Sequence, residues 1–360
     1  MTTREIALTT YRVRVAAGVL ERAGDIVAET APAHRYAIIT DANVGPVYAQ
    51  RVRDSLPGAG AQVFTIPAGE AHKTRQRWAL LTDEMLSSGF GRDSAIIALG
   101  GGVVGDLAGF VAATFMRGIP FVQIPTSLLA MIDASVGGKT GVDTPAGKNL
   151  VGAFHQPAAV IADTSVLKTL PIEHLRAGMA EALKHGVIAD ASYFERVASL
   201  ATSIETLDLT GDAALDLVAR SVEIKADIVE HDEREAGVRK TLNFGHTIGH
   251  AVELCSGYAL LHGEAVAIGM RYEALLAERL GTAEAGVAGR IDEALQSLGL
   301  ATRRPASMPV EQIVAATHSD KKARGGRVEY ALPARIGEMA ASGGSWAVPV
   351  DDEVVTQLLD

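Results

Sequence analysis

The hydrophobic residues in the first half of the chain form short continuous runs that alternate with segments of helical periodicity. Apolar residues at helical spacing, among them Trp78, Leu81 and Met85, predict a helix over 73–86, and a second helix is predicted over 107–115. Five apolar runs predict buried strands over 36–40, 62–66, 94–99, 121–124 and 159–162. Continuous apolar strands that alternate with helices are typical of a parallel sheet covered by helices on both faces.

The pattern changes near position 170. Helical periodicity dominates from there on, and strand signals are nearly absent until 328–332. The helices are predicted over 172–187, 213–229, 247–254, 264–280 and 285–298. We therefore expect two domains, an α/β domain over 1–170 and a mostly helical domain over 171–360.

Composition and charge narrow the class of protein. The 360 residues are 48% hydrophobic and 21% charged, and the formal net charge is -10, which argues against nucleic acid or an anionic membrane as the main partner. The single cysteine, Cys255, fits a reducing compartment, and 1–13 lack the apolar core of a signal peptide, so we expect a cytoplasmic protein. The apolar stretch 95–116 contains Asp106 and a glycine cluster, which favours a strand, turn and buried helix over a membrane helix.

Glycines at 100–102 and 105, followed by Asp106, separate a predicted strand from a predicted helix. Such glycines allow the backbone to approach a pyrophosphate at a helix N-terminus, but a tight structural turn explains them equally well. Asp41, at the end of an earlier strand, is a candidate for a ribose contact or for a turn residue. The segment 67–73, with Glu70 and Lys73, is interpreted as a turn that leads into a helix.

A set of acidic and histidine residues in the second half suits a metal ion. Glu181 and Lys184 share one helical face, as do His246 and His250, and His262 precedes the next long helix. One Glu and two His with an open position form the ligand set expected of catalytic zinc. A single histidine is more often a satisfied core or surface residue, and the sequence does not show that these residues meet.

Basic residues are scattered along this acidic chain. Lys139 and Lys148 lie in predicted glycine-containing loops, which suit the capture of phosphate or carboxylate. Lys184, Lys225, Arg239 and the pair Lys321 and Lys322 are further candidates. For any one of them alone, a solvated surface position is the alternative interpretation.

Several long motifs resemble the 3-dehydroquinate synthases, a family within the sugar phosphate cyclases. They are LGGGVVGDLAGFVAATFMRGIPFVQIPT at 99–126, DASVGGKTG at 133–141, GKNLVGAF at 147–154, LRAGMAEALK at 175–184, TLNFGHTIGH at 241–250 and HGEAVAIGM at 262–270. The resemblance covers nearly the whole chain. It implies a Rossmann-like NAD-binding α/β domain, a helical metal-binding domain and usually a homodimer.

The resemblance also assigns roles to residues. The implied metal ligands, for zinc or cobalt, are Glu181, His246 and His262. The implied NAD contacts are Asp41, Glu70, Lys73, Gly102, Val103, Asp106, Thr126, Ser127, Asp133, Lys139, Lys148, Leu167, Lys168 and Thr169. The implied substrate-handling residues are Asp133, Lys139, Asn149, Lys184, Lys225, Arg239, Asn243 and His250, with Lys321 or Lys322, and with Arg117 reaching in from a neighbouring subunit. Small departures from the family pattern at Ser127, His185 and Met131 remove no required group. His250 is expected to handle a proton or contact phosphate rather than bind the metal.

The implied substrate is 3-deoxy-D-arabino-heptulosonate 7-phosphate, a sugar phosphate of the shikimate pathway to aromatic amino acids. NAD oxidises it transiently, phosphate is eliminated, the hydride returns, and an intramolecular aldol step closes the carbocycle to 3-dehydroquinate. Three alternatives remain open: another sugar phosphate cyclase of the 2-deoxy-scyllo-inosose or valiolone type, a metal-dependent polyol dehydrogenase, and a non-catalytic binding protein.

Overall fold

The computed structural model divides into two compact units. It describes residues 2–56, 60–145, 147–201, 209, 211–318, 323–324, 327–341 and 344–360. Unit 1 comprises Met1–Leu170 with Thr210–Ala226, and unit 2 comprises Pro171–Leu209 with Asp227–Asp360. The sequence predicted a single domain boundary at 170, whereas the structure groups 210–226 with the first unit. Helical periodicity predicts a helix, but it does not indicate which core the helix joins.

Unit 1 is built on a seven-stranded sheet with the order β1-β2-β9-β6-β5-β3-β4. All neighbouring strands are parallel except β1 (Thr3–Ala7) and β2 (Arg12–Ala16), which are antiparallel. The five strands predicted from apolar runs are confirmed as β3 (Arg35–Asp41), β4 (Ala61–Ile66), β5 (Ser94–Gly100), β6 (Phe121–Pro125) and β9 (Ala159–Asp163). Every residue of β5, β6 and β9 is buried, which explains why these segments are continuous apolar runs.

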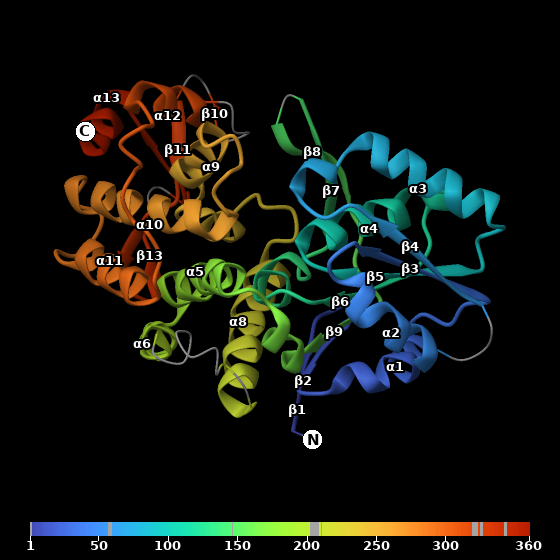
Figure 1. Cartoon of the computed structure of the whole chain (residues 1–360). Helices are drawn as coiled ribbons and strands as arrows, with labels where there is room; N and C mark the ends of the chain where they lie inside the picture. The colour runs from blue at the N-terminus through green and yellow to red at the C-terminus, as the bar shows by residue number, and fades with distance from the viewer. Residues whose placement is uncertain are drawn as a thin grey trace. The chain divides into compact units, whose positions relative to one another are not determined.

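Helices cover both faces of this sheet. Figure 1 shows α1 (Ala23–Thr30) and α2 (Gln50–Ser55) on one side, and α3 (Arg75–Ser87) and α4 (Gly102–Thr114) on the other. The side chains of α3 and α4 form one buried cluster with those of β3 and β5. The apolar stretch 95–116 is thus β5, a glycine turn and the buried helix α4, as expected. No helix in the described part of the chain is long and apolar enough to cross a membrane.

An antiparallel hairpin carries two of the candidate lysines. Lys139 begins β7 (Lys139–Thr144) and Lys148 is the second residue of β8 (Gly147–Phe154), so their prediction as loop residues is wrong. The glycines here permit close pairing of the strands. A Cβ atom at Gly152 would lie 2.0 Å from the carbonyl oxygen of Thr140. Glycine in this segment therefore marks close backbone approach and not a flexible loop.

Unit 2 is mostly helical, as predicted. Its helices are α5 (Ile172–Ala189), α6 (Ala191–Ser199), α9 (His246–Cys255), α10 (His262–Arg279), α11 (Val287–Ser297), α12 (Val310–Thr317) and α13 (Asp352–Leu359). The long helix α8 (Gly211–His231) belongs to unit 1 as far as Ala226. The predicted strand near 328–332 corresponds to β11 (Arg327–Tyr330), which pairs with β10 (Ala323–Arg324) and β14 (Val348–Val350), while β12 (Pro333–Arg335) pairs with β13 (Glu338–Met339).

Candidate functional site

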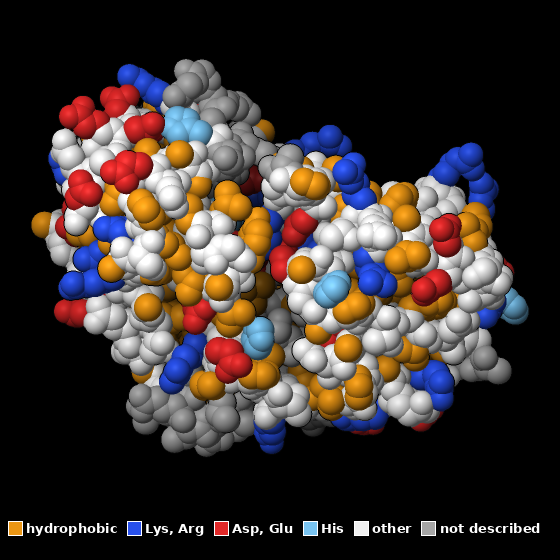
Figure 2. Space-filling view, turned by 45° about the horizontal axis from the view of Figure 1, so that its top comes forward, with side chains coloured by type: hydrophobic (Ala, Val, Ile, Leu, Met, Phe, Trp, Pro, Cys, Tyr) orange, Lys and Arg blue, Asp and Glu red, His pale blue; other side chains and the backbone are white. Residues whose placement is uncertain are grey.

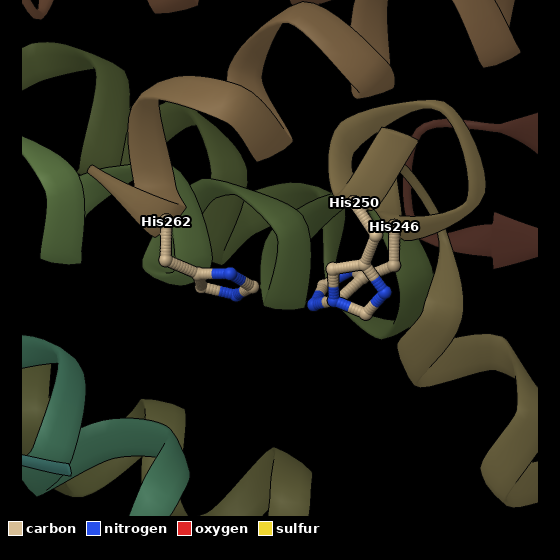
Figure 3. Close-up of side chains that lie close together, drawn as sticks. All are labelled: His246, His250 and His262. Carbon is tan, nitrogen blue, oxygen red and sulfur yellow. The ribbon is translucent and has the colours of Figure 1, made fainter. Parts of the chain in front are cut away.

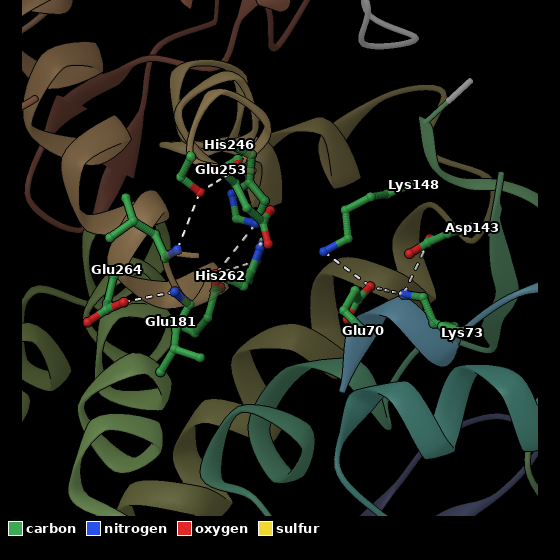
Figure 4. Close-up of polar contacts among 12 residues, drawn as sticks. Glu70, Lys73, Asp143, Lys148, Glu181, His246, Glu253, His262 and Glu264 are labelled. Atoms are coloured by element: carbon green, nitrogen blue, oxygen red, sulfur yellow. Dashed lines mark hydrogen bonds and ion pairs between the residues drawn. The ribbon is translucent and has the colours of Figure 1, made fainter. Parts of the chain in front are cut away.

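Three helices of unit 2 bring Glu181, His246 and His262 together. Glu181 lies in the middle of α5, whereas His246 and His262 are the first residues of α9 and α10. The Oε1 atom of Glu181 lies 3.5 Å from Nε2 of His246 and 3.6 Å from Nε2 of His262. Figure 4 shows these side chains converging from their separate helices. The three residues that the resemblance implies as metal ligands therefore point at a common position.

His250 joins the same group. The rings of His246, His250 and His262 lie with their centroids 5.2 to 5.6 Å apart, and one nitrogen of each lies within 4.8 Å of the others. Figure 3 shows His246 and His250 on one helix, with His262 facing them. This geometry also permits a three-histidine ligand set, so the proton-handling role of His250 stays a prediction.

Hydrogen bonds on the far side of each ring orient the two candidate ligands. The Nδ1 atom of His246 lies 3.0 Å from the carbonyl oxygen of Phe244, and Nδ1 of His262 lies 3.4 Å from Oε2 of Glu253. A ring that donates from Nδ1 presents the lone pair of Nε2, the form that binds a metal. The sequence analysis missed Glu253, although it follows His246 by seven residues and so shares the face of α9 that carries both histidines.

The electrostatics of this group favour a cation. Glu181 and Lys184 are almost fully buried, and their charged atoms lie 2.5 Å apart. Burial alone raises the pKa of Glu181, but the charge of Lys184 and the closeness of the two histidines lower it well below its usual range. Burial, together with the charge of Lys184, lowers the pKa of His246 far below normal and keeps the ring neutral. Oε2 of Glu181 is paired with Lys184, whereas Oε1, which faces both histidines, is buried without a hydrogen bond, which a divalent cation would replace.

The further polar candidates of unit 2 that the structure describes lie on α5 and in the 3-10 helix η7 (Val238–Asn243), which follows α8. Arg239 is buried, its Nη1 donates to the carbonyl oxygen of Glu233 at 2.5 Å, and its backbone N–H donates to Asp232 at 3.0 Å. Asn243 donates from Nδ2 to Oε1 of Glu235 at 2.6 Å. Lys184 donates to the carbonyl oxygen of Leu242 at 2.9 Å. The candidates Lys321 and Lys322 lie outside the described residues.

A second charged cluster lies in unit 1, around Lys73. Its buried Nζ atom lies 2.7 Å from Glu70, 3.3 Å from Asp106 and 3.7 Å from Asp143, and Lys148 lies 3.1 Å from the same oxygen of Glu70 (Figure 4). Burial raises the pKa of Glu70, but the two lysines together lower it to about 2. Burial raises the pKa of Asp143 to about 6 despite its closeness to Lys73. Four implied NAD contacts therefore form one network, to which Asp143 adds a residue that the sequence analysis missed.

The glycine turn before α4 serves packing at one position and leaves room at two others. A Cβ atom at Gly100 would lie 2.6 Å from Val104, so this glycine is required for the strand to meet the helix. At Gly101 and Gly102 the nearest atoms would lie at 3.6 and 3.4 Å, an ordinary contact distance. The backbone there, followed by Val103, remains suited to close approach by a pyrophosphate at the start of α4.

Other implied contacts of unit 1 lie at the carboxyl ends of strands or beside them. Asp41 ends β3 and accepts the backbone N–H groups of Asn43 and Val44 at 2.8 and 2.9 Å, which confirms its interpretation as a turn residue. The ribose contact stays a prediction. Thr126 and Ser127 directly follow β6, and Leu167, Lys168 and Thr169 lie in the 3-10 helix η6 (Thr164–Thr169) after β9.

Substrate candidates of unit 1 lie on α8, the hairpin and two short turns. Lys225 donates from Nζ to both the carbonyl and the carboxylate of Asp133, each at 2.6 Å. Asn149 has a left-handed φ of 54°, and its backbone N–H donates to Asp143 at 2.8 Å. Arg117 is exposed, with a left-handed φ of 70°, and Lys139 is also exposed. On the face drawn in Figure 2, basic and acidic side chains are interspersed without a continuous basic patch.

Comparisons with known proteins agree on one family. The family model for the 3-dehydroquinate synthase N-terminal region matches 63–177, and the model for the C-terminal region matches 178–323. The chain is 45% identical to the 3-dehydroquinate synthase of Symbiobacterium thermophilum, over 94% of this chain and 95% of that protein. It is 46% identical to the enzyme of the same name from Caulobacter vibrioides, over 91% of this chain and 90% of that protein.

Solved structures of other cyclases share the fold. A 2-deoxy-scyllo-inosose synthase, crystallised with carbaglucose-6-phosphate, NAD+ and Co2+, has a TM-score of 0.88 at 26% identity and covers 99% of both chains. The 2-epi-5-epi-valiolone synthase of Streptomyces hygroscopicus, solved with NAD+ and Zn2+, has a TM-score of 0.87 at 29% identity, over 100% of this chain and 98% of that one. A probable glycerol dehydrogenase from Sinorhizobium meliloti, at 17% identity and a TM-score of 0.65 over 96% and 94% of the chains, shares the fold alone. The chain belongs to the 3-dehydroquinate synthase family.

Proposed function

We propose that this protein converts 3-deoxy-D-arabino-heptulosonate 7-phosphate to 3-dehydroquinate and phosphate, with NAD regenerated in each turnover and one divalent metal ion, zinc or cobalt. The observation that carries the proposal is the convergence of Glu181, His246 and His262, with Oε1 of the buried Glu181 facing both rings and lacking a hydrogen bond. Relatives at 44–46% identity that cover nearly the whole chain are named for this activity.

The residues of unit 2 prepare the proposed metal site. Glu181, His246 and His262 would hold the cation, which, when bound, polarises hydroxyl oxygens of the substrate and stabilises negative charge on them. Lys184 keeps Glu181 ionised, and Glu253 and the carbonyl of Phe244 hold the two rings with Nε2 toward the site. His250, beside both rings, is placed to hold or release a proton.

The residues of unit 1 would bind the dinucleotide and the polar groups of the substrate. The backbone at Gly102 and Val103 would approach the pyrophosphate, while Glu70, Lys73, Asp106 and Lys148 form the charged network beside it. Thr126, Ser127, Leu167, Lys168 and Thr169 follow neighbouring strands, where ligands of open parallel sheets bind. We assign Asp133, Lys139, Asn149 and Lys225 of unit 1, and Lys184, Arg239 and Asn243 of unit 2, to the substrate, whose phosphate and carboxylate suit lysine and arginine.

A second candidate is another sugar phosphate cyclase. The inosose and valiolone synthases share the fold at TM-scores of 0.88 and 0.87, but at only 26% and 29% identity. Lys225, Arg239, Asn243 and His250 retain the dehydroquinate synthase pattern in this chain, which favours the first proposal. A polyol dehydrogenase is supported by fold alone.

The decisive experiment incubates the cobalt- or zinc-loaded protein with the heptulosonate phosphate and NAD. We expect equal amounts of phosphate and dehydroquinate, without net NADH. NADH that accumulates in step with product would favour a dehydrogenase, and turnover of a different sugar phosphate in place of the heptulosonate would favour another cyclase. The matched control is His262→Ala, which removes one proposed ligand.

We also propose that the protein forms a homodimer and works in the cytoplasm. The supporting feature for dimerisation is β8, which in the described part of the chain pairs only with β7 and exposes Leu150, Val151 and Phe154. An exposed apolar edge strand favours association with another chain. Light scattering should give a molar mass of two chains, and the Val151→Lys variant should have a mass closer to that of one chain. A monomeric wild-type protein at micromolar concentration would contradict the dimer.

A further inference from the structure

The helix that carries His246 and His250 has no side-chain cap of its own. The N-cap of α9 is Gly245, which has a left-handed φ of 78° and no side chain to accept a hydrogen bond. Helices usually satisfy their first turn with Ser, Thr, Asp or Asn at this position. Without another partner, backbone N–H groups and the positive end of the helix dipole would be left beside His246, the first residue of the helix.

Glu273 supplies the missing cap from a different helix. It lies in α10 and is completely buried, its Oε2 atom accepts the N–H of Gly245 at 2.7 Å, and its Oε1 atom accepts the N–H of Ile248 at 2.9 Å. Ile248 is the third residue of α9, the position that an N-cap side chain normally bonds, and Gly245 occupies the position that a capping-box glutamate normally bonds. One carboxylate therefore makes both hydrogen bonds of a capping box.

Close packing ties the same turn to α10. A Cβ atom at Gly269, one helical turn before Glu273, would lie 1.9 Å from the carbonyl oxygen of Gly245. A Cβ atom at Gly245 would lie 2.4 Å from the side chain of Met270. The start of α9 thus rests against the backbone of α10, the helix that begins at His262. The two histidine-bearing helices are held together at this point.

We propose that Glu273 is a positioning residue of the metal centre. Its carboxylate fixes the first turn of α9, and with it the direction of the His246 ring relative to His262, and it offsets the positive helix end beside the bound cation. Glu264 caps α10 by accepting the N–H of Leu261 at 2.8 Å, but it does so within its own helix. Glu273 acts across two helices and so sets the spacing of the ligands. The inference rests on the proposed function, because it takes His246 and His262 as ligands.

The test is a cobalt titration of the purified full chain and its Glu273→Gln variant. Glutamine keeps the size of the side chain and one acceptor oxygen, but it loses the charge and the second acceptor. We expect Co2+ affinity to fall on the order of 10-fold or more, as it does when groups that orient metal ligands are removed, and the visible absorption of bound Co2+ to change. Neither readout depends on turnover, and a purely structural role would move neither.

The matched control is Glu278→Gln in the same helix. Oε1 of Glu278 accepts the N–H of Ala288 at 2.9 Å, at the start of α11, so it performs a similar capping bond away from the histidines. We expect this variant to bind Co2+ with unchanged affinity and absorption. If Glu273→Gln does not fold by circular dichroism, Glu273→Asp carries the same test, because it keeps the charge and shortens the reach.

Unchanged cobalt affinity and absorption in the folded Glu273 variant would overturn the inference, even if the variant melts earlier. Failure of the proposed function appears elsewhere, namely as a wild-type protein that binds no cobalt or forms no dehydroquinate. If the wild-type protein binds cobalt and forms dehydroquinate, and the Glu273 variant binds cobalt equally well, only the positioning role is refuted.

Discussion

Replacing Lys73 with methionine tests the charged network of unit 1 most directly. Methionine keeps most of the volume of the side chain and removes the charge that three carboxylates share, at 2.7 Å from Glu70, 3.3 Å from Asp106 and 3.7 Å from Asp143. Lys73 is almost fully buried, whereas the carboxylates retain 18 to 31% of their exposure. Lysine removal therefore leaves negative charges together in a poorly solvated place.

Two routes give a similar magnitude for this loss. Breaking a buried ion pair by removing one partner costs about 3–5 kcal/mol, and partial exposure of the carboxylates places this case at the lower end. The pKa of Glu70 is about 2, against 4.5 for an ordinary glutamate, which corresponds to about 3–4 kcal/mol at roughly 1.4 kcal/mol per pKa unit. Solvent screening weakens the interaction, and Lys148 contributes part of it, so the stabilisation of Glu70 by Lys73 is about 2 kcal/mol. The ion pairs of Lys73 with Asp106 and Asp143 add to this value. We expect a loss of about 3 kcal/mol.

The pH dependence of this loss has a definite sign. Because the folded-state pKa of Glu70 is lowered, its contribution is present at neutral pH and is lost as the pH falls from about 4.5 toward 2. The pKa of Asp143 is raised to about 6, so this carboxylate becomes neutral as the pH falls through that value. Loss of the charge removes repulsion among the carboxylates. This stabilises the variant, which lacks Lys73, more than the wild type, in which Lys73 balances the charge. The stability difference should therefore be largest near pH 7.5, smaller at pH 5 and smallest near pH 2.

The assay is urea and thermal unfolding of the protein without NAD, at pH 7.5 and pH 5. A loss of about 3 kcal/mol lowers the melting temperature of a unit of this size by about 6–12 °C. Lys148→Met is the matched control, because Lys148 pairs with the same Glu70 but is more exposed and should cost only about 0.5–1 kcal/mol. Equal losses in the two variants, or a gap that widens on acidification, would refute the reasoning.

Three further substitutions, the last with a matched control, test other parts of the molecule. His262→Ala should lose its bound metal, measured by elemental analysis after gel filtration, with an unchanged circular dichroism spectrum, and full activity in the metal-free variant would end the metal assignment. Lys225→Ala should impair turnover far more than NAD binding measured by fluorescence titration, and an equal loss of both would place Lys225 on the wrong ligand. Gly269→Ala should destabilise the protein by about 1–3 kcal/mol, because its Cβ would lie 1.9 Å from the carbonyl of Gly245. Gly289→Ala, in α11 with nothing within 4 Å, should instead stabilise it by about 0.5–1 kcal/mol, and a similar sign for both would contradict the packing argument.

The five parallel strands β3, β4, β5, β6 and β9 and the helices α3 and α4 of unit 1 were predictable because their signals are local. A strand buried on both faces, such as β5 or β9, is necessarily a continuous apolar run, and the glycines that join β5 to α4 stand next to each other in the sequence. The antiparallel pair β1 and β2 was not predicted. Both strands are short and carry charged residues, among them Arg4, Glu5, Arg12 and Arg14, so no apolar run marks them.

Glycine was the least reliable signal. At 139–154 the sequence pattern predicted loops, because glycine usually marks turns, whereas Gly141 and Gly152 lie directly opposite each other in the β7–β8 hairpin. The same residue type serves close strand pairing there, close helix packing at Gly269 and a left-handed N-cap at Gly245. Only the surrounding structure distinguishes these uses.

The sequence by itself determined the fold class, the family and the residue types available for chemistry, because periodicity and long motifs are properties of neighbouring residues. The tertiary structure decided which of those residues meet. Glu181 lies far along the chain from His246 and His262, and their convergence depends on how α5, α9 and α10 pack. The cap that Glu273 supplies to α9 leaves no trace in local sequence at all, since a hydrogen bond between two helices is fixed by packing and not by spacing.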